Sequence, residues 1–351
     1  MKYSVKVVTL LLCILMVLSS LFIGCSNIKR DKAKESEPVV EEERIVIGFA
    51  QVGAESDWRS ANTESMKSTF TTENGYELIF EDGQQKQTNQ ITAIRSFIQQ
   101  EVDYIVLAPV TETGWDTVLQ EAKDAGIPVI IVDRMVDVED DSLFTCWVGS
   151  NFELEGRKAC EWLHEYCDLN NINASDIHIA DIQGTLGNSA QIGRTNGLLA
   201  TSEQYGWDVV AMADGDFTQS KGREAMDGLL REYNNINVVY CENDNSAMGA
   251  IEALEAAGKT VGSDIKNGEI MVISFDGVNE EALSYVLEDK ITLIAECNPL
   301  HGPRVQTIID ELEAGDVPEK YTYVDEGMIS AYPDITKLSL DGGLYEVIIM
   351  K

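Results

Sequence analysis

Histidine and cysteine are scarce in this sequence, and their scarcity excludes several kinds of site. The three histidines, His164, His178 and His301, are scattered along the chain and do not have the spacing of zinc ligands. They also stand far from every candidate binding loop, so no Ser/His/Asp set can be assembled. The seven cysteines include no CxxC pair. We therefore expect no metal site, no cofactor and no catalytic residues.

The later cysteines predict no disulfide framework either. Cys160 and Cys167 lie two helical turns apart, about 10 Å along a helix axis, which exceeds the reach of a disulfide bond. We expect buried thiols, suited to a reducing or anaerobic habitat, although the sequence leaves their redox state open. Beyond residue 25 the cysteines are odd in number and irregularly spaced, at Cys146, Cys160, Cys167, Cys241 and Cys297.

Positive charge is also in short supply. Against 60 acidic residues the chain has 26 Lys and Arg, which gives a formal net charge of -34 at pH 7. A field of this sign repels nucleic acid and anionic lipid headgroups, so neither is an expected partner. A neutral small-molecule ligand remains compatible with this charge.

Only the N-terminus carries a hydrophobic run close to the length of a membrane-spanning helix. Two lysines precede the apolar stretch Val7–Ile23, and Gly24-Cys25-Ser26 follows it at once. A small residue before a cysteine resembles the lipobox of bacterial lipoproteins, which implies a signal peptide over residues 1–24 and an acylated Cys25. The alternative is an uncleaved membrane anchor with an incidental cysteine. Either interpretation places the rest of the chain outside the cytoplasmic membrane and attached to it.

The segment that follows the predicted anchor is charged and lacks aromatic residues. Residues 25–43 show no apolar period, so we expect a flexible tether there. The remaining stretch of about 300 residues exceeds what one hydrophobic core usually supports. We therefore expect two lobes.

From residue 45 onward, short runs rich in Val and Ile alternate with amphipathic stretches of helical length. Continuous apolar strands between helices predict parallel sheets covered on both faces, so the expected fold class is α/β. The expected strands are Ile45–Val52, Leu78–Glu81, Tyr104–Val110, Pro128–Asp133, Ile177–Gln183, Val209–Ala213, Val238–Glu242, Ile270–Phe275 and Ile291–Glu296. The expected helices span residues 58–73, 87–100, 114–125, 152–168, 189–204, 218–232, 246–257, 279–289 and 302–314.

The alternation of strands and helices is interrupted in the middle of the chain. A charged connector at Asp133–Asp141 and a short strand at Cys146–Ser150 precede a second series of strands and helices. We place a first crossing between lobes near residues 148–151, with two more near 296–299 and 326–330, because the tail is too short to form its own lobe. Three hinge crossings would allow the lobes to close on each other. The first lobe would comprise residues 44–149 plus 298–327, and the second residues 150–297 plus 328–351.

In open α/β sheets a ligand sits at the carboxyl ends of the strands. Those ends carry carboxylates, amides and arginines here, with no Cys or His, and the one serine, Ser56, is followed by no base. Such groups suit a polyol, because each hydroxyl both donates and accepts, and Trp58 and Phe217 could stack on a sugar ring. The alternative is that the Asp and Asn side chains only cap the next helices. The strand-end residues are Glu55 to Arg59, Asp82, Asp133, Arg134, Gln183, Asp214, Asn243, Asp244, Asp276 and Glu296.

Two segments come near nucleotide-binding motifs but lack required residues. Gly258-Lys259-Thr260 resembles the end of a phosphate-binding loop, but Ala253 stands where the first glycine is needed, and the segment ends a helix. Residues 184–197 follow a strand and open a helix without the dinucleotide glycine spacing. We expect the glycines of residues 184–197 to let the loop pass close to a ligand.

Seven segments, in order along the chain, carry a resemblance to a known family. They are GFAQVGAESDWR at 48–59, DGQQKQTNQ at 82–90, APV at 108–110, PVIIVDR at 128–134, GDFTQSKG at 215–222, NDNSAMG at 243–249 and FDG at 275–277. Over residues 45–335 the sequence resembles the ribose- and galactose-type periplasmic binding proteins, the sugar-binding subunits of ABC importers with the type I periplasmic-binding fold. The first two segments are specific to the galactofuranose-binding members of that family.

The resemblance implies ligand contacts residue by residue. Trp58 would face the sugar, Phe217 would stack on it, and Arg194 matches the arginine of the second lobe. Asp57 departs from the glycine of close relatives, which leaves the ligand open at that loop, and the tail after residue 337 departs as well. The expected ligand-binding residues are Glu55, Ser56, Asp57, Trp58, Arg59, Asp133, Arg134, Arg194, Phe217, Asn243, Asp276 and Glu296.

The resemblance implies a protein that binds and does not catalyse. We expect a monomeric extracytoplasmic lipoprotein that closes around one monosaccharide, such as galactofuranose, and presents it to the membrane subunits of an ABC importer. A sugar-sensing partner of a receptor kinase or chemoreceptor stays open as the alternative. A LacI-type repressor would need an N-terminal helix-turn-helix, and a glycosidase would need a paired acid and base beside an open cleft. The sequence does not determine which sugar or ring form binds, or its affinity.

Overall fold

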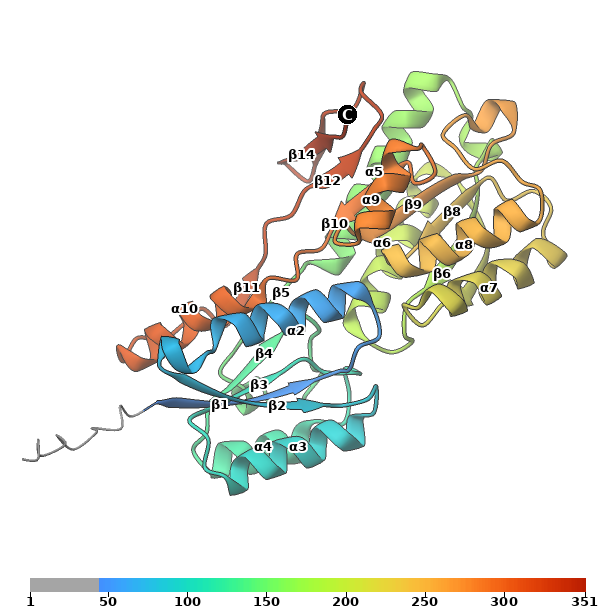
Figure 1. Cartoon of the computed structure of the whole chain (residues 1–351). Helices are drawn as coiled ribbons and strands as arrows, with labels where there is room; N and C mark the ends of the chain where they lie inside the picture. Colours follow the sequence, from blue (N-terminus) through green and yellow to red (C-terminus); the bar gives the residue numbers. More distant parts are fainter. Residues whose placement is uncertain (1–43) are drawn as a thin grey trace, which may run out of the picture. The chain divides into compact units, whose positions relative to one another are not determined.

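Residues 44–351, which the computed structural model describes, are built on two β-sheets, one in each of two lobes (Figure 1). Helices cover both faces of each sheet, and most strand pairs are parallel, so the α/β fold class expected from the sequence is confirmed. The predicted signal peptide, acylated Cys25 and tether lie outside the described residues. Within residues 44–351, no helix combines the length and the hydropathy that a membrane span requires.

The first lobe contains a six-stranded sheet with the order β11-β5-β4-β3-β1-β2, all pairs parallel. Helices α2 and α10 pack side by side on one face, and α3 and α4 cover the other (Figure 1). The elements are β1 (Ile45–Gln51), α2 (Asp57–Thr69), η1 (Thr72–Asn74), β2 (Tyr76–Asp82), α3 (Gln87–Gln99), β3 (Tyr104–Leu107), α4 (Asp116–Asp124), β4 (Val129–Val132), η2 (Asp141–Leu143), β5 (Cys146–Gly149), α10 (His301–Glu313) and β11 (Tyr321–Tyr323).

The second lobe contains an eight-stranded sheet with the order β13-β14-β12-β10-β9-β8-β6-β7. Helices α5 and α6 cover one face, and α7, α8 and α9 cover the other. The elements are α5 (Phe152–Asn170), η3 (Ala174–Asp176), β6 (His178–Gln183), α6 (Ser189–Tyr205), β7 (Asp208–Asp214), α7 (Gln219–Glu232), β8 (Val238–Cys241), α8 (Asp244–Ala256), η4 (Ile265–Asn267), β9 (Met271–Asp276), α9 (Glu280–Leu287), β10 (Leu293–Glu296), β12 (Met328–Ser330), β13 (Lys337–Leu340) and β14 (Gly343–Ile349).

Capping side chains fix the turns that lead from strands into helices. Ser56 Oγ accepts a hydrogen bond from the N–H of Arg59 at 3.2 Å, which starts α2 directly after the loop that follows β1. Asn243 Oδ1 accepts from the N–H of Ser246 at 2.9 Å and starts α8 in the same way. These caps hold the residues beside them at the carboxyl edge of each sheet.

The chain passes between the two sheets three times. The first crossing (residues 150–151) joins β5 to α5, the second crossing (residues 297–300) joins β10 to α10, and the third crossing (residues 324–327) joins β11 to β12. Figure 1 shows the second and third crossings as orange and red stretches of chain between the lobes.

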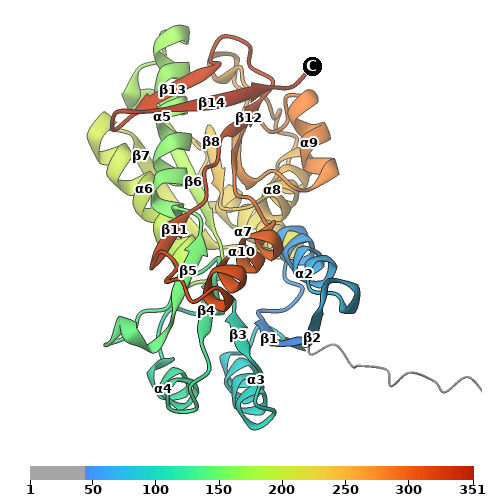
Figure 2. The ribbon, with the colours of Figure 1, turned by 90° about the vertical axis from the view of Figure 1, so that its left-hand side faces the viewer.

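The C-terminal tail forms two strands that the sequence analysis did not predict. β13 and β14 pair with each other, and β14 extends the second sheet by pairing with β12. Figure 2 shows them in red across the end of the second lobe, beside α5. Leu338 and Val347 are buried in the core cluster under α5, and the turn between the strands is tied to α5 by Arg157 Nη2, which donates to Asp341 Oδ1 at 3.0 Å. Burial in this non-local pairing accounts for Leu338 and Val347, whereas Leu344 and Ile348 of β14 are exposed.

Candidate ligand-binding site

A cavity lies between the two lobes, at the carboxyl ends of their strands. Its lining residues surround about 280 Å³ of non-atom space, part of it open to solvent. Charged and aromatic side chains dominate its wall. The first lobe contributes Glu55, Ser56, Trp58, Arg59, Asp133 and Arg134, and the second contributes Phe152, Ala190, Arg194, Phe217, Asn243 and Asp276, with Cys297 at the second crossing.

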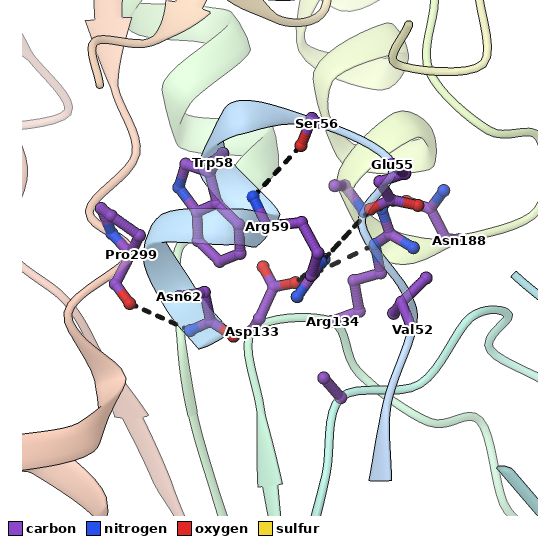
Figure 3. Close-up of polar contacts among 12 residues, drawn as sticks. Val52, Glu55, Ser56, Trp58, Arg59, Asn62, Asp133, Arg134, Asn188 and Pro299 are labelled. Atoms are coloured by element: carbon purple, nitrogen blue, oxygen red, sulfur yellow. Dashed lines mark hydrogen bonds and ion pairs between the residues drawn. The ribbon is translucent and has the colours of Figure 1, made fainter. Parts of the chain in front are cut away.

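Four charged residues of the first lobe form a buried ionic cluster on one wall (Figure 3). Arg59 Nη2 donates to Asp133 Oδ2 at 2.6 Å and to Glu55 Oε1 at 3.3 Å. Arg134 Nη2 donates to the same Glu55 oxygen. Each of these side chains is at most 4% exposed, so their attraction is little screened by solvent.

Burial and charge pairing oppose each other in this cluster. Burial alone would raise the pKa of Asp133, but the guanidiniums of Arg59 and Arg134 hold that pKa below its ordinary value. Burial lowers the pKa of Arg59, yet Asp133 and Glu55 raise it overall. For Arg134 burial has the largest effect, the positive charge of the neighbouring Arg59 acts in the same direction, and its pKa is lowered. Asp133 therefore stays ionised at neutral pH and can accept hydrogen bonds from a ligand.

Several polar atoms of the cluster still lack a partner. Nε and Nη1 of Arg134 and Oε2 of Glu55 are buried and make no hydrogen bond with any of residues 44–351. A buried group left unpaired costs about 1–3 kcal/mol. A hydroxyl that accepts from Arg134 and donates to Glu55 removes both penalties at once. The wall is therefore suited to a ligand rich in hydroxyls.

Arg194 is the charged centre of the opposite wall. Its Nε donates to Glu155 Oε2 at 2.9 Å, its Nη2 to Asp276 Oδ1 at 3.3 Å, and its Nη1 to the backbone carbonyl of Glu242. Burial raises the pKa of Asp276 well above its ordinary value, although Arg194 opposes this. Each lobe thus presents at least one arginine held by carboxyl groups.

Aromatic rings complete the cavity. Trp58 lies beneath the Arg59 guanidinium, whose Cζ is 4.7 Å from the ring centroid, and Phe217 lies 5.2 Å from Arg134 Cζ across the cavity. Phe217 fits only because residue 184 is glycine: a Cβ there would stand 2.0 Å from the Phe217 ring. Gly184 thus permits a close approach to a wall side chain; that these glycines let the loop pass close to a ligand stays a prediction.

Three residues of the wall adopt left-handed backbone conformations. The φ angles are +62° at Asp133, +55° at Phe217 and +96° at Asp276. Such angles cost of order 1–3 kcal/mol for residues other than glycine, and they cluster at functional sites. Each of these residues lies at or just after the end of a strand or in the loop that follows it.

The two lobes also contact each other around the cavity. Trp58 Nε1 donates to the carbonyl oxygen of Cys297 at 2.7 Å. On one side of the cavity, the N–H of Met135 donates to Ser189 Oγ at 2.8 Å. On another side, Asp57 Oδ2 accepts from Asn245 Nδ2 at 2.9 Å. These bonds hold the lobes against each other with the cavity between them.

The structure brings ten of the twelve expected ligand-binding residues to the cavity wall. Asp57 and Glu296 do not line it. Asp57 is exposed and bonds to Asn245 and Asn279 of the other lobe. Glu296 Oε2 accepts from the N–H of Gly327 at 3.0 Å, so its carboxylate bonds the end of β10 to the third crossing. The residues at the wall are Glu55, Ser56, Trp58, Arg59, Asp133, Arg134, Arg194, Phe217, Asn243 and Asp276.

Three wall residues were absent from the expected set: Phe152, Ala190 and Cys297. Cys297 directly follows Glu296 at the end of β10, so the strand-end rule applied one residue further would have found it. Phe152 and Ala190 lie in the first turns of α5 and α6 and carry no polar signal. Apolar wall residues of this kind cannot be distinguished from core residues by sequence pattern.

Two wall residues also act as helix caps, which was the alternative role considered for strand-end residues. Asn243 and Ser56 each cap a helix and also line the cavity. The hydroxyl of Ser56 lies by the N–H of Arg59, and no histidine or lysine lines the wall formed by the described residues. The arrangement provides hydrogen-bond donors and acceptors for a polar ligand.

One group of potential metal ligands comes together among residues 44–351, beside the cavity. Ligand atoms of Glu155, Cys297 and Glu326 lie within 4.8 Å of one another, and all three side chains are buried. Glu155 is paired with Arg194, and Glu326 Oε1 accepts from Ser150 Oγ at 2.8 Å. These contacts give the carboxyl groups partners within the protein.

Known proteins match this chain along most of its length. A family model described as periplasmic binding protein domain matches residues 47–300. The galactofuranose-binding protein YtfQ of Escherichia coli (strain K12) is 38% identical over 302 residues, which cover 85% of this chain and 91% of that protein.

Solved structures agree with the family match. A protein from Mycobacterium smegmatis in complex with beta-D-fucofuranose superposes with a TM-score of 0.76 at 39% identity, covering 83% of this chain and 94% of that one. The periplasmic binding protein of the arabinose ABC transporter from Shewanella sp. ANA-3, bound to alpha and beta-L-arabinofuranose, superposes with a TM-score of 0.74 at 38% identity, covering 81% and 91%.

Proposed function

The chain belongs to the periplasmic binding protein domain family, and from this premise we propose that it is the extracytoplasmic sugar-binding subunit of an ABC importer. Its ligand is a monosaccharide, held between the lobes. The protein binds this sugar and delivers it to the membrane subunits without chemical change, as a monomer.

The observation that carries this proposal is a group of buried donors and one acceptor, unsatisfied among residues 44–351, in the first-lobe wall of the interlobe cavity. Arg134 and Glu55, whose Nε, Nη1 and Oε2 atoms have no partner among residues 44–351, line this cavity, and Arg194 lines it from the other lobe. A sugar offers hydroxyls that both donate and accept, and its C–H face can stack on Trp58 or Phe217. A missing hydroxyl would leave a buried charge unpaired, which makes such a site selective.

The relatives favour a five-membered sugar ring. One is named for galactofuranose, and two solved structures contain beta-D-fucofuranose and L-arabinofuranose. We propose a furanose of this class as the ligand here.

Closure of the lobes supplies the binding mechanism. Each lobe carries half of the contacts, so the sugar interacts with both halves only when the lobes approach, and its greater affinity for the closed form drives closure. The three crossings serve as the hinge. The membrane subunits would then recognise the closed form.

A thermal-shift screen tests the ligand assignment. Residues 26–351 are heated with D-galactose, D-fucose, L-arabinose and D-ribose, sugars that equilibrate between ring forms in water. A sugar present at about 1,000 times its Kd should stabilise the protein by about 4 kcal/mol. A clear rise in melting temperature with one sugar supports the proposal, and no rise with any furanose-forming sugar contradicts it.

Anchoring and transport need separate tests. We propose that Cys25 is acylated; Cys25→Ala should then abolish incorporation of labelled palmitate. Transport predicts that deletion of the chain abolishes uptake of the sugar found in the screen. Normal uptake in the deletion strain would contradict the importer role and favour sensing.

A further inference from the structure

Three consecutive residues at the start of α8 contact three different parts of the site. Asn243 Nδ2 donates to the backbone carbonyl of Phe217 at 2.9 Å, and both residues line the cavity. Asn245 Nδ2 donates to Asp57 Oδ2 of the first lobe at 2.9 Å. Asp244, between them, is 1% exposed and does not line the cavity. Any role of Asp244 at the site is therefore indirect.

The carboxylate of Asp244 holds the loop between β9 and α9. Its Oδ2 accepts from the backbone N–H groups of Gly277 at 2.9 Å and Val278 at 3.2 Å. Its Oδ1 accepts from Ser274 Oγ, in β9, at 2.9 Å. Asp244 is also the first residue of α8, where the helix dipole favours a negative charge. This one side chain therefore fixes the loop to the start of a neighbouring helix.

The loop carries a residue of the site at each end. Asp276 directly precedes the two bonded N–H groups; it lines the cavity and accepts from Arg194 Nη2 at 3.3 Å. Its left-handed φ of +96° is a conformation that persists only where the surrounding contacts impose it. Asn279 directly follows the same N–H groups, and its side chain donates to Asp57 Oδ2 of the first lobe. A shift of the loop would move both residues.

We propose that Asp244 is a positioning residue for sugar binding, which holds Asp276 in the cavity wall and Asn279 against Asp57 of the first lobe. This inference deepens the proposed function and rests on it. One buried carboxylate would then connect the ligand wall to the contact between the lobes, although it lines no part of the cavity itself. Its effect on affinity would come through the loop alone.

Two substitutions of Asp244 should differ in their effect on affinity. Asp244→Ala removes the acceptor of both loop N–H groups, so sugar affinity should fall by at least about tenfold. Asp244→Asn should bind within about threefold of the native chain, because its amide oxygen can accept from both N–H groups while its NH₂ donates to Ser274 Oγ. Isothermal titration at a temperature well below the melting temperatures measures both, with whichever of D-galactose, D-fucose and L-arabinose binds.

Asp289→Ala is the matched control for a loss of stability. Asp289 Oδ2 likewise accepts from a serine hydroxyl and a backbone N–H, both of Ser263, at 2.8 and 3.1 Å. It lies before β10 begins, at the opposite edge of the sheet from the cavity. The control should lower the melting temperature and bind the sugar within about twofold of the native chain. If it lost as much affinity as Asp244→Ala, general loosening of the lobe would explain both results, and the proposal would be overturned.

A double variant tests the connection to the lobe–lobe contact. Asp57→Gly removes the first-lobe partner of Asn279. Because Asp244 is proposed to act partly through Asn279, Asp57→Gly should weaken binding by a smaller factor in Asp244→Ala than in the native chain. Strictly additive losses would overturn the connection.

A measurement without sugar separates this proposal from the proposed function. Amide hydrogen exchange followed by NMR reports on the N–H groups of Gly277 and Val278 directly. Both should be protected in the native chain and in Asp244→Asn, and should exchange at least about tenfold faster in Asp244→Ala. If no sugar binds but this pattern is found, the role of Asp244 in the loop stands and the sugar assignment fails.

Two results would contradict the positioning role. Unchanged exchange in Asp244→Ala would mean that the carboxylate does not hold the loop. Faster exchange with native sugar affinity would mean that Asp244 serves the fold alone. If Asp244→Ala does not fold, Asp244→Ser replaces it with the same expected losses, because serine suits a helix start but its side chain is one atom shorter.

Discussion

Asp57 and Asn245 join the two lobes across the mouth of the cavity without contacting its interior. Asn245 Nδ2 donates to Asp57 Oδ2 at 2.9 Å, and the N–H of Asp57 donates to Asn245 Oδ1 at 3.1 Å. Asn279, the N-cap of α9, donates to the same carboxylate oxygen. In the proposed mechanism these bonds exist only when the lobes are together, so they would stabilise the closed form itself.

Asp57→Gly should weaken sugar affinity without changing selectivity. Exposed hydrogen bonds contribute little each, so the loss of the two bonds to the Asp57 carboxylate should cost about 1 kcal/mol, or about fivefold in Kd. The dissociation rate should rise by a similar factor, while the ranking of sugars stays the same. Stopped-flow fluorescence measures the rates. Asn245→Ala should weaken binding by a similar factor. The double variant should lose no more binding free energy than the sum of the two single losses. A changed ranking of sugars would show that Asp57 contacts the ligand.

Arg134→Ala should abolish binding and leave the protein folded. Arg134 presents two unpaired donors to the cavity, so its loss should lower affinity by about 100-fold or more, equivalent to about 2.7 kcal/mol. Burial already lowers its pKa, and Glu55 keeps Arg59 as a partner, so the melting temperature should change little. Isothermal titration measures the affinity, and calorimetric melting measures the melting temperature. Arg95→Ala is the matched control, because it removes an exposed Arg–Glu pair far from the site; retained affinity in Arg134→Ala would remove this residue from the site.

The fold was predictable from the sequence because its signals are local. Apolar strands such as Val129–Val132 and caps such as Asn243 lie within a few residues of the boundaries they set. Strands β11 to β14 were missed. β11 and β12 have only three residues each, and β13 and β14 depend on pairing with β12 and on burial under α5, which no local pattern encodes.

The site was predictable where a polar side chain ends a strand, as at Asp133 and Asp276. Phe152 and Ala190 were missed because an apolar wall and an apolar core have the same pattern. Asp57 lies beside cavity residues in the sequence, yet the start of α2 points it at the other lobe, where Asn245 and Asn279 hold it. Only the relative placement of the lobes distinguishes a rim contact from a ligand contact.

Stability should fall as the pH rises through the neutral range, because the second lobe buries two acids together. Both carboxylate oxygens of Asp181 lack a partner among residues 44–351, and burial beside Glu242 raises its pKa well above the ordinary value. Burial also raises the pKa of Glu242 to about 8. When folding raises the pKa of a carboxyl group, the stability that this group contributes is fully present below its ordinary pKa near 4. That contribution is lost as the pH rises through the pKa of the folded state. Urea denaturation between about pH 5 and pH 8.5 should show the decline.

Asp181→Asn should flatten that decline. The amide cannot ionise, so the variant should gain stability relative to the native chain at pH 8, with a difference in slope of up to about 1.4 kcal/mol per pH unit. Asp316→Asn, at an exposed position, should leave the slope unchanged. An unaltered slope in Asp181→Asn would mean that this pair does not carry the proton uptake.

Cys297 should be the thiol that reports on closure. The other four cysteines of residues 44–351 lie in the cores of the lobes, whereas Cys297 lines the cavity and is 2% exposed. Opening of the lobes should expose it alone, so a maleimide should label Cys297 first in a chain without Cys25. A saturating sugar should slow that labelling by about tenfold or more, because it shifts the population to the closed form. Mass spectrometry of the labelled peptides measures site and rate, and Cys297→Ala should lack the fast phase. If a sugar that raises the melting temperature left the labelling rate of Cys297 unchanged, binding would not close the lobes over this cavity, and the hinge mechanism would be wrong even though the ligand was right.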